Sequence, residues 1–132
     1  IFKFFNDILE CAKKYEINLV YKSHKDLDNP KSYLGKHTRW SSRYTNYIKK
    51  LKNEVILVDY NVSEFKIIEN TKFSISYPWT STAFIAEKLN KKTFFYDPTK
   101  QLSPNDRGSQ GIYLIRNERE LERIFKNIKL EI

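Results

Sequence analysis

The order of hydrophobic and polar residues predicts helices and strands that alternate along the chain. Hydrophobic residues such as Phe4, Ile8 and Leu9 recur at helical spacing near the start, so we expect a first helix packed by one face. Short apolar runs, typical of buried strands, follow it. The predicted strands are Ile17–Tyr21, Val55–Asp59, Phe73–Tyr77, Thr93–Tyr96 and Ile112–Ile115, and the later helices are Arg39–Leu51, Ser63–Ile68, Ser81–Leu89 and Glu118–Ile128.

This alternation, with short connections, predicts an α/β fold: a Rossmann-like three-layer sandwich with a mostly parallel sheet and helices on both faces. A length of 132 residues is enough for a single domain with a real core. The chain has only three glycines, and neither a G-x-G-x-x-G fingerprint nor a P-loop is present. Dinucleotide oxidoreduction and Walker-type ATP hydrolysis are therefore disfavoured. Because the chain has no Met and opens in a helical pattern, we expect it to be a fragment of a longer two-domain protein.

The stretch from Phe73 to Ala83 is the most informative part of the chain. It predicts a strand, a tight turn at residues 77–80 (the Thr80 turn), and a helix that opens on the hydroxyl residues Thr80, Ser81 and Thr82. Free backbone N–H groups at a helix N-terminus bind anions, and ligands of open α/β sheets lie beyond the carboxyl ends of the strands. We therefore expect a phosphate-bearing ligand, although one hydroxyl would also serve as a simple helix cap.

The net charge of +8 is concentrated between Lys22 and Lys52, where Asp26 and Asp28 are the only acids. Such a stretch attracts phosphates, nucleic acid or an anionic membrane surface, or it is simply a solvated helix face. The single cysteine, Cys11, excludes an internal disulfide and a zinc cluster and indicates a reducing compartment. No apolar run reaches the ~20 residues that span a bilayer.

Three segments carry a resemblance to a family of bacterial surface-carbohydrate biosynthesis proteins. They are Lys22-Ser23-His24, Ser76–Ala83, and Phe95–Thr99 followed by Asn105–Gly108. More broadly, the chain resembles the C-terminal, donor-binding half of GT-B glycosyltransferases. The resemblance implies a nucleotide-sugar as substrate, no metal or other cofactor, and an N-terminal acceptor-binding domain elsewhere in the protein. It also implies a cytoplasmic location, free or peripheral at the inner face of the membrane.

The resemblance assigns roles to several residues. In sialyltransferase- and Kdo-transferase-like relatives, a His-Pro pair and a Ser-Ser or Ser-Thr pair hold the donor phosphate. His24 matches the first pair, but Lys25 replaces the proline, which weakens the case for a CMP-sugar. The donor-phosphate candidates are Lys22, Ser23, His24, Thr80, Ser81 and Thr82, and the candidates for ribose or sugar contacts are Glu87, Asp59, Asp97 and Arg107.

Strand-end residues of a parallel sheet share one edge, so we expect Lys22, Ser23, His24, Asp59 and the Thr80 turn to lie along it. Asp59 and Asp97 would equally order their own loops, and Asp106 and Arg107 would equally pair with each other. No catalytic base is assigned to this chain, because in this architecture the base comes from the other half. Metal ligation is not expected.

Two other functions remain open at the level of sequence. A phosphotransferase of the teichoic-acid polymerase type would use the same fold with a CDP-alcohol donor. A non-catalytic basic module would dock through Arg39–Lys52, with at most weak association with anionic membranes. The aromatic residues of that stretch, Trp40, Tyr44 and Tyr47, recur at helical spacing and look like core, which argues against nucleic acid as a partner.

Overall fold

A computed structural model of the chain describes residues 2–22, 46–47, 50–59, 61–103 and 105–131. The chain divides into two compact units, one formed by Ile1–Ile17 with Glu64–Ile132 and the other by Asn18–Ser63. Each unit has its own parallel sheet. The larger unit contains the Thr80 turn, and the smaller unit contains Lys22 and Asp59, so the candidate residues are divided between the two.

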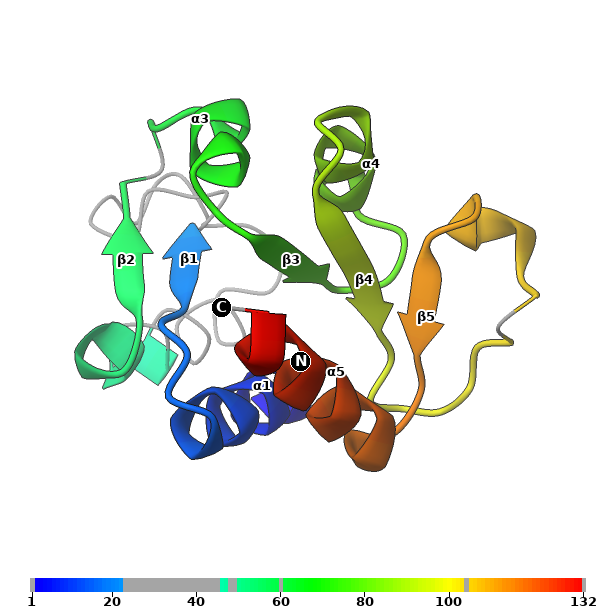
Figure 1. Cartoon of the computed structure of the whole chain (residues 1–132), viewed down its shortest axis with the longest axis horizontal. Coiled ribbons are helices and arrows are strands. Elements are labelled where there is room, and N and C mark those ends of the chain that lie inside the picture. Colours follow the sequence, from blue (N-terminus) through cyan, green and yellow to red (C-terminus); the bar gives the residue numbers. More distant parts are fainter. Residues whose placement is uncertain (1, 23–45, 48–49, 60, 104, 132) are drawn as a thin grey trace. The chain divides into compact units, whose positions relative to one another are not determined.

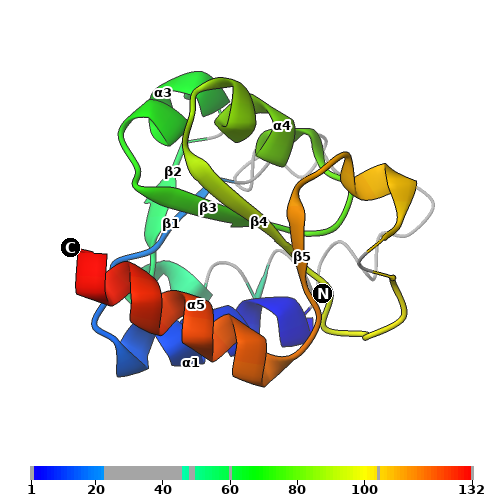
Figure 2. The same cartoon turned by 45° about the vertical axis from the view of Figure 1, so that its right-hand side comes forward.

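The larger unit is built on three parallel strands, β3 (Phe73–Ser76), β4 (Lys92–Tyr96) and β5 (Tyr113–Ile115), in the order β3-β4-β5. Helix α4 (Ser81–Lys88) connects β3 to β4. Figures 1 and 2 agree that α4 and α3 (Glu64–Glu69) cover one face of this sheet, while α1 (Phe2–Lys14) and α5 (Glu118–Glu131) cover the other. Parallel strands between helices on both faces confirm the predicted Rossmann-like α/β class.

Side-chain alternation along the strands divides the core between the two faces. On the α4 face, Ala83, Phe95 and Leu114 form a buried cluster with Ile112. On the opposite face, the rings of Phe73 and Phe125 lie 5.7 Å apart between β3 and α5. Burying one such side chain stabilises the fold by roughly 1.5–3 kcal/mol, so both helical layers contribute to stability.

The end of α1 explains why the first predicted strand starts late. Glu16 adopts a left-handed conformation (φ 53°), and the N–H of Ile17 donates to the carbonyl of Ala12 at 2.9 Å. This is a Schellman closure of the helix, and it uses the backbone of Ile17 that the sequence pattern assigns to a strand. The strand therefore begins only at Val20.

The smaller unit contains β1 (Val20–Lys22) and β2 (Ile56–Val58), which pair in parallel with Lys22 beside Val58. A short 3-10 helix, η2 (Leu51–Asn53), precedes β2. The predicted helix Arg39–Leu51 lies mostly outside the described residues, of which Asn46, Tyr47 and Lys50 are helical. Both strands are shorter than the apolar runs that predicted them.

Candidate functional site

The carboxyl ends of the three strands in the larger unit meet at one edge of the sheet. Strands β3, β4 and β5 end at Ser76, Tyr96 and Ile115. The N–H of Asp97 also donates to the carbonyl of Ile115 at 2.9 Å, so pairing between β4 and β5 continues one residue beyond the strands. This edge, called the carboxyl edge below, is where ligands of open α/β sheets bind.

The Thr80 turn connects β3 to α4 with a constrained backbone. The N–H of Thr80 lies 3.4 Å from the carbonyl of Tyr77, which closes a four-residue turn with Pro78 in its second position. Trp79, in the third position, has φ 66°. That position of a type II turn usually takes glycine, and a bulky residue there is strained. Backbone strain of this kind is concentrated at functional sites.

Thr80 is the N-cap residue of α4, yet its side chain does not cap the helix. Its backbone is extended (φ −82°, ψ 153°), and its hydroxyl makes no capping hydrogen bond. Among the described residues, the Thr80 Oγ1 is buried and has no hydrogen-bond partner. A simple helix cap would use this oxygen to accept from the first backbone N–H groups. The Thr80 side chain therefore does not accept from the first backbone N–H groups of α4, and its own hydroxyl could bind a ligand.

Ser76, the last residue of β3, presents a second hydroxyl of this kind. Its side chain is 7% exposed, and its Oγ has no partner within the described part of the chain. Two residues earlier on the same face, the Ser74 Oγ lies 2.8 Å from the Thr93 Oγ1 of the neighbouring strand. Ser76 instead has Phe95 beside it in register, and phenylalanine offers no acceptor or donor. An unpaired buried hydroxyl costs stability, so such groups usually have a ligand or water as partner.

The other hydroxyls and the acid of α4 are placed differently. Ser81 is exposed in the first turn, and the Thr82 Oγ1 lies 3.5 Å from the Glu64 Oε2, at the outer limit of a hydrogen bond. Glu87 is exposed near the end of the helix, about 9 Å along the axis from Ser81. Among the three hydroxyls at the start of α4, only that of Thr80 is a buried oxygen without a hydrogen-bond partner in the described part of the chain.

Trp79 of the Thr80 turn is 36% exposed, and its ring contacts two neighbouring segments. Its ring lies 5.2 Å from that of Phe95 in a T-shaped arrangement, and it closely covers Gly108 in η3 (Arg107–Ser109). A Cβ on Gly108 would lie 3.2 Å from the indole. Trp79 therefore acts as a plug between the strand edge and the long 97–110 loop, and it links the Thr80 turn to that loop.

Replacing Gly108 by alanine is expected to displace Trp79, because the added methyl group would lie closer to the indole than ordinary van der Waals contact allows. The measurement is a shift of tryptophan fluorescence relative to the parent chain. Gly111→Ala is the control: Gly111 has φ 86° and open space around it, so its variant should lose about 1 kcal/mol of stability without a shift. An unchanged emission in Gly108→Ala would contradict the packing of Trp79 on this loop.

Asp97, predicted as a sugar contact or a loop organiser, makes hydrogen bonds within its own loop. It is 3% exposed, and its carboxylate accepts from the backbone N–H groups of Thr99, Gln101 and Leu102 and from the Thr99 hydroxyl. Burial alone would raise the pKa of Asp97, but these hydrogen bonds outweigh it and hold the pKa below its usual value. The carboxylate thus shapes the start of the 97–110 loop.

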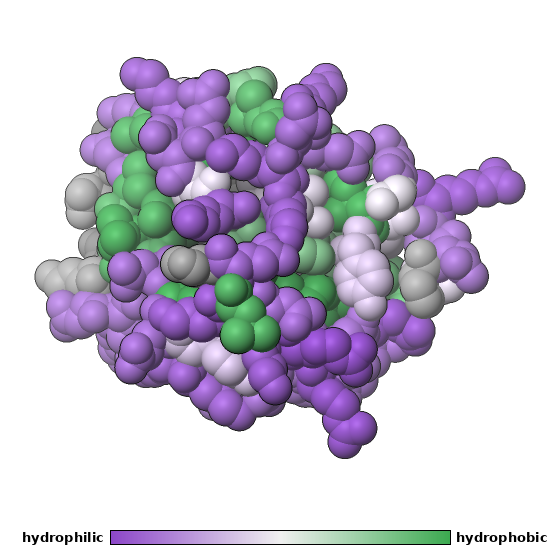
Figure 3. All heavy atoms as spheres, viewed as in Figure 1, coloured by the Kyte–Doolittle hydropathy of each residue, from purple (hydrophilic) through white to green (hydrophobic). Residues whose placement is uncertain are grey.

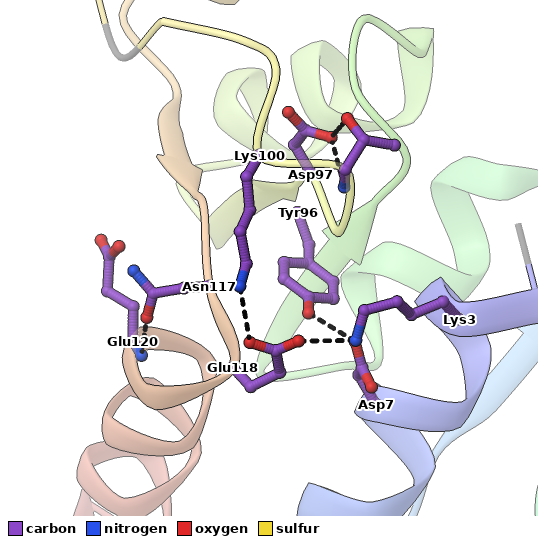
Figure 4. A network of polar contacts seen from close by, with 9 residues as sticks. Lys3, Asp7, Tyr96, Asp97, Lys100, Asn117, Glu118 and Glu120 are labelled. Carbon is purple, nitrogen blue, oxygen red and sulfur yellow. Dashed lines mark hydrogen bonds and ion pairs between the residues drawn. The ribbon is translucent and has the colours of Figure 1, made fainter.

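A polar network crosses the carboxyl edge on the side of α1 and α5 (Figure 4). The Tyr96 hydroxyl donates to Asp7 at 2.6 Å, and the Lys3 ammonium binds both Asp7 (2.9 Å) and Glu118 (2.6 Å). Lys100 approaches the other oxygen of Glu118 at 3.5 Å. The hydrogen bond from Lys3 lowers the pKa of Glu118 to about 2, and burial followed by the bond to Asp7 raises the pKa of Tyr96. Glu118 is therefore ionised, and both carboxylates of this network already have partners.

The remaining predicted residues lie in η3, in the smaller unit or outside the described residues. Arg107 is exposed, and Asp106 accepts from the backbone N–H of Gly108 at 2.8 Å. Lys22 and Asp59 share the carboxyl edge of the smaller unit, where Asp59 accepts from the N–H of Asn61 at 2.9 Å. Ser23 and His24 lie outside the described residues. The expected meeting of these residues with the Thr80 turn stays a prediction.

Arg116, which the sequence reasoning missed, directly follows β5. Its Nε is the third buried polar atom that has no hydrogen-bond partner among the described residues, after those of Ser76 and Thr80. All three atoms belong to segments at the carboxyl ends of strands. A strand-end arginine is visible in a sequence, but its lack of a partner depends on the three-dimensional arrangement.

Two hollows lie elsewhere in the larger unit. One, of about 410 Å³, is lined at the amino end of β4 by Lys92 and Phe94 and by Ile124 and Ile128 of α5. The other, of about 240 Å³, lies between α1 and α5 and includes Cys11, whose pKa burial raises to about 11. A thiol with this pKa stays protonated near neutral pH and is a poor nucleophile.

The described part of the chain contains neither a cluster of metal ligands nor a membrane-spanning helix. No three His, Cys, Asp or Glu side chains there are grouped as metal ligands. None of its helices is both long and apolar enough to cross a bilayer. On the face shown in Figure 3, hydrophobic side chains form separate patches among hydrophilic ones. The strongest signal for a ligand is therefore the carboxyl edge.

The fold defines a Rossmann-like α/β protein with a strand–turn–helix element at its carboxyl edge. The chain belongs to the family of polysaccharide biosynthesis PFTS motif proteins, whose model matches residues 1–125. No curated protein and no solved structure shows significant similarity to it. The family places the chain in polysaccharide biosynthesis, in agreement with its resemblance to surface-carbohydrate biosynthesis proteins.

Proposed function

We propose that this chain is the donor-binding domain of a glycosyltransferase in surface polysaccharide or lipopolysaccharide biosynthesis. The observation that carries the proposal is the pair of buried hydroxyl oxygens of Ser76, at the end of β3, and Thr80, the N-cap of α4, neither of which has a hydrogen-bond partner among the described residues. Backbone N–H groups at a helix N-terminus bind phosphate oxygens, and buried hydroxyls nearby would donate to the same oxygens. The donor phosphate would lie there.

The family description adds a second line of support. Read as amino acids, the letters PFTS correspond to Pro78-Trp79-Thr80-Ser81, where tryptophan replaces phenylalanine, another aromatic residue. No other four consecutive residues of the chain share three of these letters in order. On this interpretation, the motif that names the family would be the end of the Thr80 turn and the first residue of α4.

In the proposed mechanism, this domain binds and orients the donor and stabilises its leaving group. The leaving phosphate gains negative charge as the sugar departs, and the N-terminal end of a helix dipole with fixed N–H groups stabilises that charge without a metal ion. The nucleotide-sugar is a substrate, and no cofactor is required. The acceptor and the general base would be supplied by an N-terminal half of the GT-B type.

Candidate residues outside α4 keep supporting roles in this proposal. Lys22 or His24 would balance the phosphate charge, and the neutral Ser23 hydroxyl would donate a hydrogen bond, if the two units bring these residues to the Thr80 turn. Glu87, Arg107 and Asp59 are candidates for ribose or sugar contacts, and Asp97 would act by ordering its loop.

The experiment is a thermal-shift screen of the chain against UDP-, CMP-, GDP- and CDP-linked sugars and CDP-linked alcohols. A donor at 100 times its dissociation constant should stabilise the fold by ~2.7 kcal/mol. A shift with a sugar nucleotide supports the proposal, and a shift confined to CDP-alcohols favours a teichoic-acid-type phosphotransferase. If no donor shifts the transition and the chain instead sediments with anionic vesicles in a salt-sensitive manner, the basic docking function replaces both.

A further inference from the structure

We propose that Arg116 binds a second phosphate group, so that the carboxyl edge takes a nucleoside-diphosphate-linked donor rather than a nucleoside-monophosphate-linked one. This inference rests on the proposed function and specifies its substrate class. It follows from the position of Arg116, from its lack of a countercharge among the described residues, and from its separation from the α4 N-terminus.

The position of Arg116 follows from the register of the sheet. Leu114 contributes to the buried cluster with Ala83 and Phe95 on the α4 face. Because successive side chains of a strand alternate between faces, Arg116 follows Leu114 on the same face. Pairing of Asp97 with Ile115 keeps this segment at the sheet edge. Ser76 and Arg116 therefore belong to the same face and the same edge, and α4, with Thr80 as its N-cap, covers this face.

In the described part of the chain, the acids Asp97, Glu118 and Asp7 at the carboxyl edge all have partners other than Arg116. Asp97 accepts from its own loop through both oxygens. Glu118 binds Lys3 and Lys100, and Asp7 binds Lys3 and Tyr96. None of the described ion pairs includes Arg116. A guanidinium is always charged, and its buried Nε without an acceptor is costly, so an anionic ligand is the partner that fits it.

The separation between the two groups favours two phosphates over one. Ser76 belongs to β3, and Arg116 follows β5, with β4 between them. Neighbouring strands lie about 4.8 Å apart, so the two backbone positions differ by roughly 10 Å across the sheet. A phosphate at the α4 N-terminus would satisfy Ser76 and Thr80, and a second, linked phosphate would extend toward β5. There the planar guanidinium can bind it through two parallel hydrogen bonds.

The test compares inorganic phosphate with inorganic pyrophosphate, which removes the unknown base and sugar from the measurement. Binding to the full chain is followed by NMR titration or calorimetry, with Arg116→Gln, Arg116→Lys and the control Arg123→Gln. Arg123 is exposed on α5, on the opposite face of the sheet, so its variant loses the same charge. We expect Arg116→Gln to weaken pyrophosphate binding about tenfold or more, with a much smaller effect on phosphate. Arg116→Lys should retain part of the affinity, and Arg123→Gln nearly all of it.

Two results would overturn the inference. Equal binding of phosphate and pyrophosphate by the parent chain would do so without any variant. Equal effects of Arg116→Gln and Arg123→Gln on pyrophosphate would show that only net charge matters. In both cases, phosphate binding that is lost in Ser76→Ala would leave the proposed function standing. Failure of both anions and of every nucleotide donor to bind would reject the proposed function itself.

Discussion

Replacing Ser76 by alanine is expected to stabilise the fold and weaken phosphate binding at the same time. The Ser76 hydroxyl is buried without a partner among the described residues, so its removal should raise the free energy of unfolding by about 1 kcal/mol. Loss of a hydrogen bond to a charged phosphate should cost ~1.5–3 kcal/mol of binding, or about ten- to hundredfold in affinity. Thr80→Val should likewise raise the free energy of unfolding and weaken phosphate binding, since the Thr80 side chain makes no capping bond. Chemical denaturation and calorimetry with pyrophosphate measure the two quantities.

Ser74→Ala provides the matched control, because it is the same substitution on the same strand and face. The Ser74 hydroxyl is bonded to Thr93, so its removal should lower stability by about 1 kcal/mol and leave binding unchanged. If Ser76→Ala and Ser74→Ala both destabilise the fold and neither affects binding, the two hydroxyls at α4 have only a structural role.

Replacing Asp97 by alanine is expected to cost about 3–5 kcal/mol of stability, since the backbone N–H groups of Thr99, Gln101 and Leu102 would lose their buried, charged acceptor. The pKa of Asp97 is lowered in the fold, so its contribution is present above the unfolded pKa of about 3.9 and is lost as the pH falls through the folded value. The difference between the parent and Asp97→Ala should therefore narrow below about pH 4. Urea denaturation at several pH values measures it.

Asp59→Ala is the comparison for this prediction. Asp59 is also at a strand end, but it is exposed and accepts from Asn61 within its own loop. Its variant should lose much less stability than Asp97→Ala. Equal losses would indicate that the hydrogen bonds of Asp97 do not order the 97–110 loop.

The fold class could be predicted from the sequence because the signal is repeated. Each apolar run is followed by a segment with helical spacing, and the short connections leave few alternatives to parallel strands. Strand ends were less predictable, since they depend on backbone hydrogen bonds. Ile17 is apolar and β-branched, but its N–H closes α1, so hydrophobicity alone places the strand too early.

The candidate site was partly predictable for a similar reason. Three consecutive hydroxyls at a helix start identify the Thr80 turn, and the α4 N-cap is indeed Thr80. Ser76 and Ser74 have the same residue type and the same periodicity, and only the register beside Phe95 or Thr93 distinguishes them. For Arg116, the relevant fact is the engagement of Asp97, Glu118 and Asp7 by other groups, and no local pattern contains it.

The pairing of the first and last helices affects how the protein folds during synthesis. Lys3 of α1 bonds Glu118 of α5, 115 positions later in the chain. At about 5–20 residues per second, the ribosome would need roughly 6–23 s to make the intervening chain. During that time the apolar side of α1 has no α5 to pack against. We therefore expect nascent chains that end before α5 to be bound by chaperones and cleaved by proteases more readily than chains that include α5.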